Sequence, residues 1–167
     1  MNKSLLGNLE SSSDQLFNRL TPQKRIYLSR QKLPRRKISN GEEVESLLCK
    51  HGFTSISPQE HDISMIEQLI KTSQIVIGAN GAALCNTIFS CCSDQKTAII
   101  YPISHIDNYY FRVTNSLGRK FYGMQSNEII PEKSLGEMIN AYYYPSLASN
   151  YNVNLSRLSI FLDFITS

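Results

Sequence analysis

The chain has 167 residues, of which 41% are hydrophobic and 19% charged, and its formal net charge at pH 7 is +3. This composition is typical of a globular protein with a sizeable core, and so mild a charge does not by itself indicate a nucleic-acid partner. No apolar run approaches the roughly 20 residues that a membrane-spanning helix needs. Residues 1–14 also lack the pattern of a secretory signal. We therefore expect a cytoplasmic protein without a membrane span.

The cysteines do not have the spacing of a disulfide framework, because two are adjacent and two fall within predicted helices. They are Cys49, Cys85, Cys91 and Cys92. No C-x-x-C or Cys/His spacing supports a metal site. We expect free thiols, no metal and no cofactor.

The first third of the chain reads as a polar lead followed by the start of one domain. Residues 1–23 form the lead, and residues 24–167 form the predicted domain. A strand is expected at residues 25–29, and a basic loop with Pro34 follows it. A helix is then predicted up to Lys50, with Asn40 as its N-cap and Gly52 as its stop. A short strand at residues 53–56 and a helix after Asp62 follow.

The most informative stretch is residues 75–89. Its first three residues are apolar and β-branched, as in a strand that is buried on both faces. Gly78 and Gly81 bracket a tight loop, and residues 82–89 have helical spacing of apolar side chains. Ligands of open α/β sheets bind beyond the carboxyl ends of strands, and a helix N-terminus favours anions. The alternative is an ordinary strand-to-helix turn without a ligand.

The rest of the chain continues the alternation of strands and helices. Strands are predicted at residues 97–101 and 120–124, and helices at 108–117, from Pro131 onward, and at 155–165. This alternation predicts an α/β, Rossmann-like, three-layer domain with a mostly parallel sheet. The strand at residues 75–77 is expected near the centre of that sheet.

The basic loop after the first strand is the second informative feature. Arg30, Arg35 and Arg36 follow a strand end that is expected at the same sheet edge as the Gly78 loop. Guanidinium groups bind phosphate oxygens through paired hydrogen bonds, so this edge suits a diphosphate. A solvated basic loop and a nucleic-acid-binding loop are the alternatives, although no nucleic-acid motif is present.

The titratable side chains do not reveal a catalytic set. His51 lies near a predicted helix end, where it would interact with the helix dipole. His105 follows a strand end and could reach the site, although a surface position is the simpler expectation. The catalytic residues therefore stay unknown at this level.

Ordered motifs between Arg25 and Tyr122 resemble glycosyltransferase family 61. The elements that match, in chain order, are Ser29-Arg30, Arg36, Asn40, Glu43, Gly52-Phe53, Glu67-Gln68, the glycine signature of Gly78, Gly81, Ala82, Leu84, Asn86 and Phe89, and then Asn108 to Phe111, Leu117-Gly118 and Tyr122. Several motifs in order over such a span are more specific than any one of them.

The resemblance implies one half of a GT-B glycosyltransferase, the half that binds the nucleotide-sugar. It implies inverting hexosyl or pentosyl transfer from a UDP-sugar to a glycan or protein acceptor, as in polysaccharide biosynthesis. An acceptor-binding domain or chain would complete the cleft. The substrate-binding residues implied are Arg30, Arg36, Gln68, Gly78, Asn80, Gly81, Ala82, Leu84 and Asn86.

Two positions depart from the family pattern. Asn80 stands where the family usually has His, and Asn cannot titrate near neutral pH. The strand at residues 99–101 also lacks an acidic residue near its end. These departures leave open a second hypothesis, a truncated or degenerate domain that binds a ligand or a partner without turnover.

Overall fold

The computed structural model describes residues 25–34, 36–103, 106, 108–126, 128–129 and 150–167. The polar lead, His105 and the helix predicted from Pro131 lie outside these residues. Within the described ranges, no helix combines the length and the apolar character needed to cross a membrane.

Five parallel strands form the central sheet, in the order β2-β1-β3-β4-β5. They are β1 (Arg25–Leu28), β2 (Thr54–Ile56), β3 (Ile75–Ala79), β4 (Lys96–Tyr101) and β5 (Lys120–Gln125). All five residues of β3 are buried, and β3 is the middle strand. The predicted α/β architecture is therefore confirmed, as is the central place of residues 75–77.

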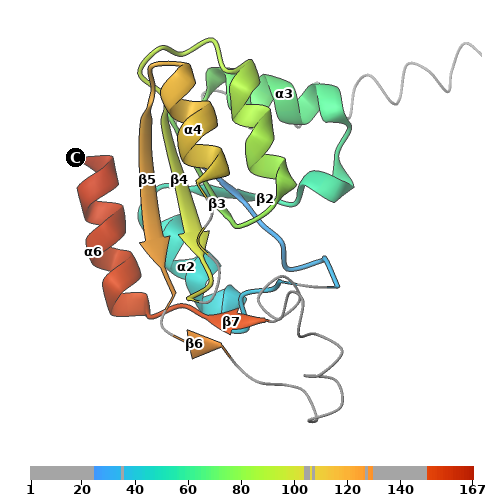
Figure 1. The fold of residues 1–167 in the computed structure, drawn as a ribbon. Coiled ribbons are helices and arrows are strands. Elements are labelled where there is room, and N and C mark those ends of the chain that lie inside the picture. Colours follow the sequence, from blue (N-terminus) through green and yellow to red (C-terminus); the bar gives the residue numbers. More distant parts are fainter. Residues whose placement is uncertain (1–24, 35, 104–105, 107, 127, 130–149) are drawn as a thin grey trace, which may run out of the picture.

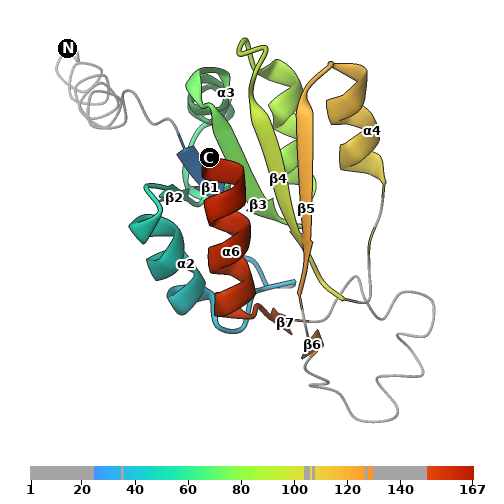
Figure 2. The same ribbon diagram turned by 90° about the vertical axis from the view of Figure 1, so that its left-hand side faces the viewer.

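Helices cover both faces of the sheet and give three layers (Figures 1 and 2). The helices α2 (Gly41–Lys50) and α6 (Leu155–Thr166) pack on one face. The helices α3 (Ile63–Thr72), η2 (Ala82–Phe89) and α4 (Tyr109–Ser116) pack on the other. A short turn of 3₁₀-helix, η1 (Pro58–Glu60), precedes α3.

An antiparallel pair of short strands, β6 (Glu128–Ile129) and β7 (Tyr151–Asn152), lies beyond the carboxyl ends of β4 and β5 (Figure 1). From β7 the chain enters α6, which returns along the sheet toward its amino edge (Figure 2). The helix predicted at residues 155–165 is thus present. Its buried residues, Leu158, Leu162 and Ile165, join the core beneath α2.

Alternating strand residues supply the two cores, as a pleated sheet requires. In β3, Ile75 and Ile77 face α2 and α6, whereas Val76 faces α3 and η2. In β4, Ile100 faces α2 and α6, whereas Ile99 faces α3 and η2. A sheet covered on both faces explains why its strands read as continuous apolar runs.

At the amino edge of the sheet, the side chains near strand starts bind the ends of helices. Arg25 donates to the carbonyl of the residue after α2 (2.7 Å), and Lys96 donates to a carbonyl in the last turn of α6 (2.8 Å). Arg119 donates to two carbonyls at the end of η2 (2.7 and 2.6 Å). Gln95 donates to two carbonyls at the end of α3 (2.8 and 2.9 Å). These contacts add donors to carbonyls at helix ends, where the regular intrahelical donors run out.

The segment after the glycine loop is helical, as predicted, but η2 is a 3₁₀-helix rather than an α-helix. The Leu84 N–H donates to Gly81 O (3.1 Å), which is an i to i+3 bond. A Cβ placed on Gly78 would meet Leu84 side-chain atoms at 3.1 to 3.3 Å. The tighter turn therefore brings Leu84 back over the bare backbone of Gly78.

The predicted cap of α2 is wrong in its mechanism, although its position is right. Asn40 precedes α2, but its side chain makes no capping hydrogen bond. Instead, Asn40 Nδ2 donates to Val153 O (2.9 Å), and Asn40 Oδ1 accepts from Val153 N (3.0 Å). The side chain is used to join the start of α2 to the chain before α6.

The strand order has one topological switch point, between β1 and β3. The chain leaves β1 through α2 on one face and leaves β3 through η2 on the other. At such a point the two outgoing loops diverge and leave a crevice beyond the carboxyl ends of the strands. Arg30 and Gly81 follow these two strands, so the fold itself brings them to this crevice.

Candidate functional site

A hollow of about 480 Å³ opens at the switch point, between the loop after β1 and the start of η2. Its walls come from three segments that are distant in sequence. They are Ser29, Arg30 and Leu33 after β1, Pro58, Gln59, His61, Ile63 and Ile66 around η1 and α3, and Ala82, Ala83 and Asn86 on η2. The basic loop and the start of η2, which directly follows the glycine loop, therefore face one shared hollow.

Arg30 lies directly against the glycine loop. A Cβ built on Gly81 would be 2.1 Å from Arg30 Nη1 and 2.9 Å from its Cζ, so only glycine leaves room for the guanidinium. The φ of Gly81 is 176°, which any residue can adopt. Gly81 is thus required here for close approach and not for backbone conformation.

The Arg30 guanidinium has no hydrogen bond or ion pair with any residue that the structure describes, and its buried Nε has no partner. Burial lowers the pKa of Arg30, and the nearby Arg36 lowers that pKa further. Both causes disfavour the positive charge, although arginine remains protonated at neutral pH. An anion at this position would relieve both effects.

Arg36 does not line the hollow, but it lies near enough to Arg30 to lower its pKa, and it has a less common backbone conformation. Its φ is +58°, the single positive value among the described non-glycine residues. Such a conformation is unfavourable for a residue with a Cβ, so surrounding contacts must hold it. The side chain is partly buried.

The basic loop is fixed by hydrogen bonds that start directly after β1. The buried Ser29 hydroxyl donates to Glu45 Oε1 (2.6 Å) and accepts from Gln31 N (3.3 Å). Gln31 Nε2 donates to Ile38 O (2.9 Å), and its amide lies where a Cβ on Gly41 would be. The loop that carries Arg30 is therefore anchored to the start of α2.

The opposite wall of the hollow is apolar. Leu33 comes from the basic loop, and Pro58 and Ile63 come from the segment after β2. An ion pair between Lys32 and Glu60 joins these two segments. Gln59 and His61 add polar atoms to this wall. The hollow thus has a basic end at Arg30 and an apolar end at Pro58 and Ile63.

The structure brings several other sequence-predicted residues to this hollow or its floor. Ala82 and Asn86 line it from η2. Asn80 lies just behind, with an exposed fraction of 4%, and its side-chain Nδ2 has no hydrogen-bond partner among the described residues. Its backbone N–H donates to Ile100 O (3.1 Å), which ties the glycine loop to the end of β4.

Three sequence-predicted residues are placed elsewhere. Gln68 is exposed on α3 and does not line the hollow. Gly78 and Leu84 are buried and pack on each other behind the glycine loop. They shape the loop but do not contact the hollow.

Two buried tyrosines near this site were not predicted from the sequence. Tyr27 and Tyr151 are 0% and 1% exposed, and burial is the main cause that raises the pKa of each hydroxyl. Arg30 interacts electrostatically with both. Tyr27 lies within a predicted strand, so its burial was foreseeable, whereas nothing in the local pattern links Tyr151 to the site.

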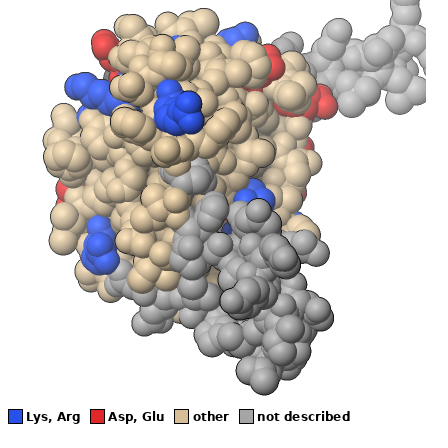
Figure 3. All heavy atoms as spheres, viewed as in Figure 1, with Lys and Arg blue, Asp and Glu red and all other residues tan. Residues whose placement is uncertain are grey.

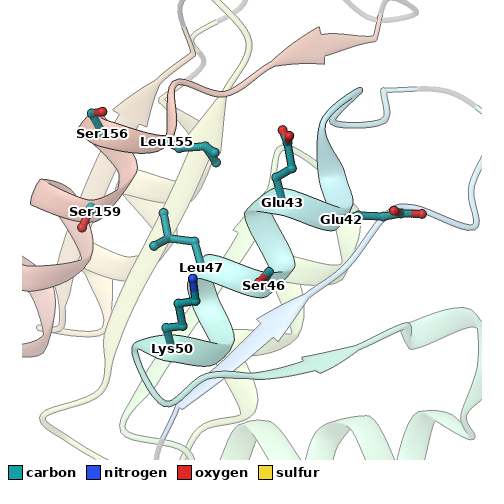
Figure 4. A pocket seen from close by; sticks show the side chains of 8 residues that line it. All are labelled: Glu42, Glu43, Ser46, Leu47, Lys50, Leu155, Ser156 and Ser159. Carbon is teal, nitrogen blue, oxygen red and sulfur yellow. The ribbon is translucent and has the colours of Figure 1, made fainter.

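A larger hollow, of about 590 Å³, lies between α2 and α6 on the other face of the sheet (Figure 4). Leu47 and Leu155 extend toward each other across it, and Glu42, Glu43 and Lys50 stand at its rim. No residue of the glycine loop or of the basic loop lines it. We therefore take the smaller hollow at the switch point as the candidate site.

The charge distribution and the thiols add little support to the alternative interpretations, a nucleic-acid-binding loop or a metal site. On the face in Figure 3, Lys and Arg side chains are scattered among uncharged residues and do not form a continuous patch. The four cysteines are free thiols. Among the described residues there is no cluster of three or more His, Cys, Asp or Glu that could hold a metal ion.

Comparison with known proteins identifies the family. The family model for Glycosyltransferase 61 matches residues 7–100, which is more than half of the chain and includes the whole candidate site from Ser29 to Asn86. The match starts earlier and ends sooner than the motifs that carry the resemblance in the sequence. No curated protein matches the chain at a significant level. On this match, the chain belongs to glycosyltransferase family 61.

Proposed function

We propose that the hollow at the switch point binds a UDP-sugar and that the chain is the donor-binding half of a glycosyltransferase. The observation that carries this proposal is Arg30. Its half-buried guanidinium has no partner among the described residues and lies on the bare backbone of Gly81, where a strand end and a helix start meet. A diphosphate is the ligand whose charge and oxygen atoms suit that arrangement.

The apolar wall supports a nucleotide rather than a free phosphate. A nucleobase could lie against Leu33, Pro58 and Ile63, with Gln59 available for hydrogen bonds to its edge. The hollow of about 480 Å³ falls within the usual range of small-molecule sites. The family membership supports a sugar as the group that the diphosphate carries.

In the proposed reaction, an acceptor hydroxyl of a glycan or protein loses its proton to a base and attacks the anomeric carbon of the sugar. The bond from that carbon to the diphosphate oxygen breaks, and UDP leaves with the electron pair, which inverts the anomeric configuration. Arg30 and Arg36 stabilise the departing negative charge. We assign no base among the described residues, and an acceptor-binding domain or chain would complete the cleft.

A second candidate function is ligand binding without turnover. Asn80 is the observation that favours it, because its buried side chain takes the place of the family's usual His and cannot transfer a proton near neutral pH. This candidate differs from the first in the sugar-transfer step alone. A turnover assay with a UDP-sugar and acceptor glycans separates the two.

Calorimetric titration with UDP, GDP, CDP and UDP-sugars tests the binding site. UDP should bind, and Arg30→Ala should weaken its binding by about 1.5–3 kcal/mol, the usual scale for hydrogen bonds to a charged group. Arg157→Ala is the matched control, since Arg157 is an exposed arginine on α6, on the other face of the sheet. Equal affinity of Arg30→Ala and the parent chain for UDP would remove the phosphate assignment.

A further inference from the structure

The segment from Asn150 to Val153 lies outside the part of the chain that matches the family model, yet it is tied to the basic loop. Tyr151 pairs with Ile38 in a parallel bridge, in which Ser39 N donates to Tyr151 O (2.8 Å) and Tyr151 N donates to Lys37 O (3.1 Å). The paired bonds between Asn40 and Val153 continue this contact. The segment therefore holds the loop directly after Arg36.

The side chain of Tyr151 reaches from this segment to the end of the sheet. Its hydroxyl donates to Ile100 O (3.2 Å), the same carbonyl that accepts from Asn80 N (3.1 Å). The Tyr151 hydroxyl and the Asn80 N–H thus share one acceptor at the end of β4, next to the turn that leads to Gly81.

We propose that Tyr151 is a positioning residue of the candidate site. Its hydroxyl fixes the Asn80–Gly81 turn against the end of β4, and its backbone fixes the loop that carries Arg36. One residue thus sets the relative position of the glycine loop and the basic loop, the two sides of the proposed phosphate site. The ligand-binding consequence of this role rests on the proposed function, whereas the placement of the turn does not.

The first experiment measures the turn without a ligand. In Tyr151→Phe, amide hydrogen exchange at Asn80 and Gly81 should become at least about tenfold faster, because the hydroxyl no longer supports the turn. Ile165→Val is the control for stability, since it removes one methylene from the same core at a position far from the site. Unchanged exchange in Tyr151→Phe, or an equal rise in Ile165→Val, would overturn the proposal.

The second experiment is a double-mutant cycle with UDP as the ligand. Tyr151→Phe should weaken UDP binding roughly five- to tenfold in the parent chain and less than about twofold in Arg30→Ala, because both changes act on the same phosphate contacts. Equal effects in the two backgrounds would contradict positioning through the site. If the parent chain does not bind UDP, the proposed function fails instead, and the exchange measurement alone decides the role of Tyr151.

Discussion

The two edges of the parallel sheet use their cationic side chains in opposite ways. At the amino edge, Arg25, Lys96 and Arg119 all donate to carbonyls at helix ends, so each cation has protein partners. At the carboxyl edge, Arg30 is half-buried and has no such partner among the described residues. Both edges have the same strands, but these three amino-edge cations are satisfied within the fold, whereas Arg30 at the carboxyl edge is not.

The comparison separates stability from function. Some buried atoms at the amino edge also lack a partner, namely Arg119 Nε and Gln95 Oε1, but other atoms of the same side chains are bonded. The Arg30 guanidinium makes no bond of this kind. An unfavourable charge is retained in a fold when something outside the fold compensates for it, as at binding sites. The amino edge therefore stabilises the domain, and the carboxyl edge is available for a ligand.

The largest expected effect is a loss of stability at alkaline pH that originates at the carboxyl edge. Burial raises the pKa of Tyr27 and of Tyr151, so both stay protonated in the folded state when the unfolded tyrosines ionise. Their stabilisation is complete below about pH 10, the unfolded value, and is lost as the pH rises above it. With two such groups, the free energy of unfolding should fall by about 2.7 kcal/mol per pH unit.

Urea unfolding between pH 8.5 and 11.5 measures this slope. Tyr27→Phe should remove about half of it, because one of the two groups is deleted. The same variant should not lose stability at pH 7, since the Tyr27 hydroxyl has no hydrogen-bond partner among the described residues. A wild-type slope in Tyr27→Phe would show that Tyr27 ionises without unfolding.

At the amino edge, Arg119→Ala should lower the free energy of unfolding by about 1–3 kcal/mol. The substitution removes the side-chain donor from the carbonyls of Thr87 and Ser90 at the end of η2, and the Thr87 carbonyl keeps only the Ser90 N–H. UDP affinity should be unchanged because Arg119 lies at the edge opposite the candidate site. Urea unfolding and calorimetry on the same variant check both statements, and a loss of UDP affinity without a loss of stability would reverse the assignment of the two edges.

A substitution at Gly81 changes the carboxyl edge without adding or removing a charge. Gly81→Ala should weaken UDP binding about tenfold, which corresponds to 1.4 kcal/mol, because the new methyl group displaces the Arg30 guanidinium. Stability should stay within about 0.5 kcal/mol, since the flexible end of an arginine can move and the backbone of Gly81 is extended. Gly123→Ala is the control, because its Cβ would meet no atom closer than 3.4 Å. Equal UDP affinities of the two variants would contradict the close packing of Arg30 on Gly81.

The sequence predicted which residues lie at the carboxyl edge better than it predicted the contacts that hold them there. Parallel strands place their carboxyl ends at one edge, so the approach of Arg30 to Gly81 followed from the order of elements alone. Gln68 does not line the hollow, because a family motif fixes a position in sequence but not the side of α3 on which it lies. Asn40 bonds to a residue 113 positions away, and Tyr151 bonds to one 51 positions away. No periodicity in the sequence predicts such contacts.

The smallest expected effect is on the free energy of unfolding, and it is the sharpest test of the difference between the two edges. Most substitutions of this kind lower stability, whereas this one is expected to cause no loss. Arg30→Met keeps an unbranched chain of similar reach and removes the charge that burial and Arg36 disfavour. The free energy of unfolding should be unchanged or raised by up to about 1 kcal/mol, while UDP binding falls as in Arg30→Ala. Urea unfolding at pH 7 of Arg30→Met and Arg119→Met, side by side, should show stability retained in the first and lost in the second. A loss above about 1 kcal/mol in Arg30→Met would mean that this guanidinium stabilises the fold, and the carboxyl edge would then resemble the amino edge.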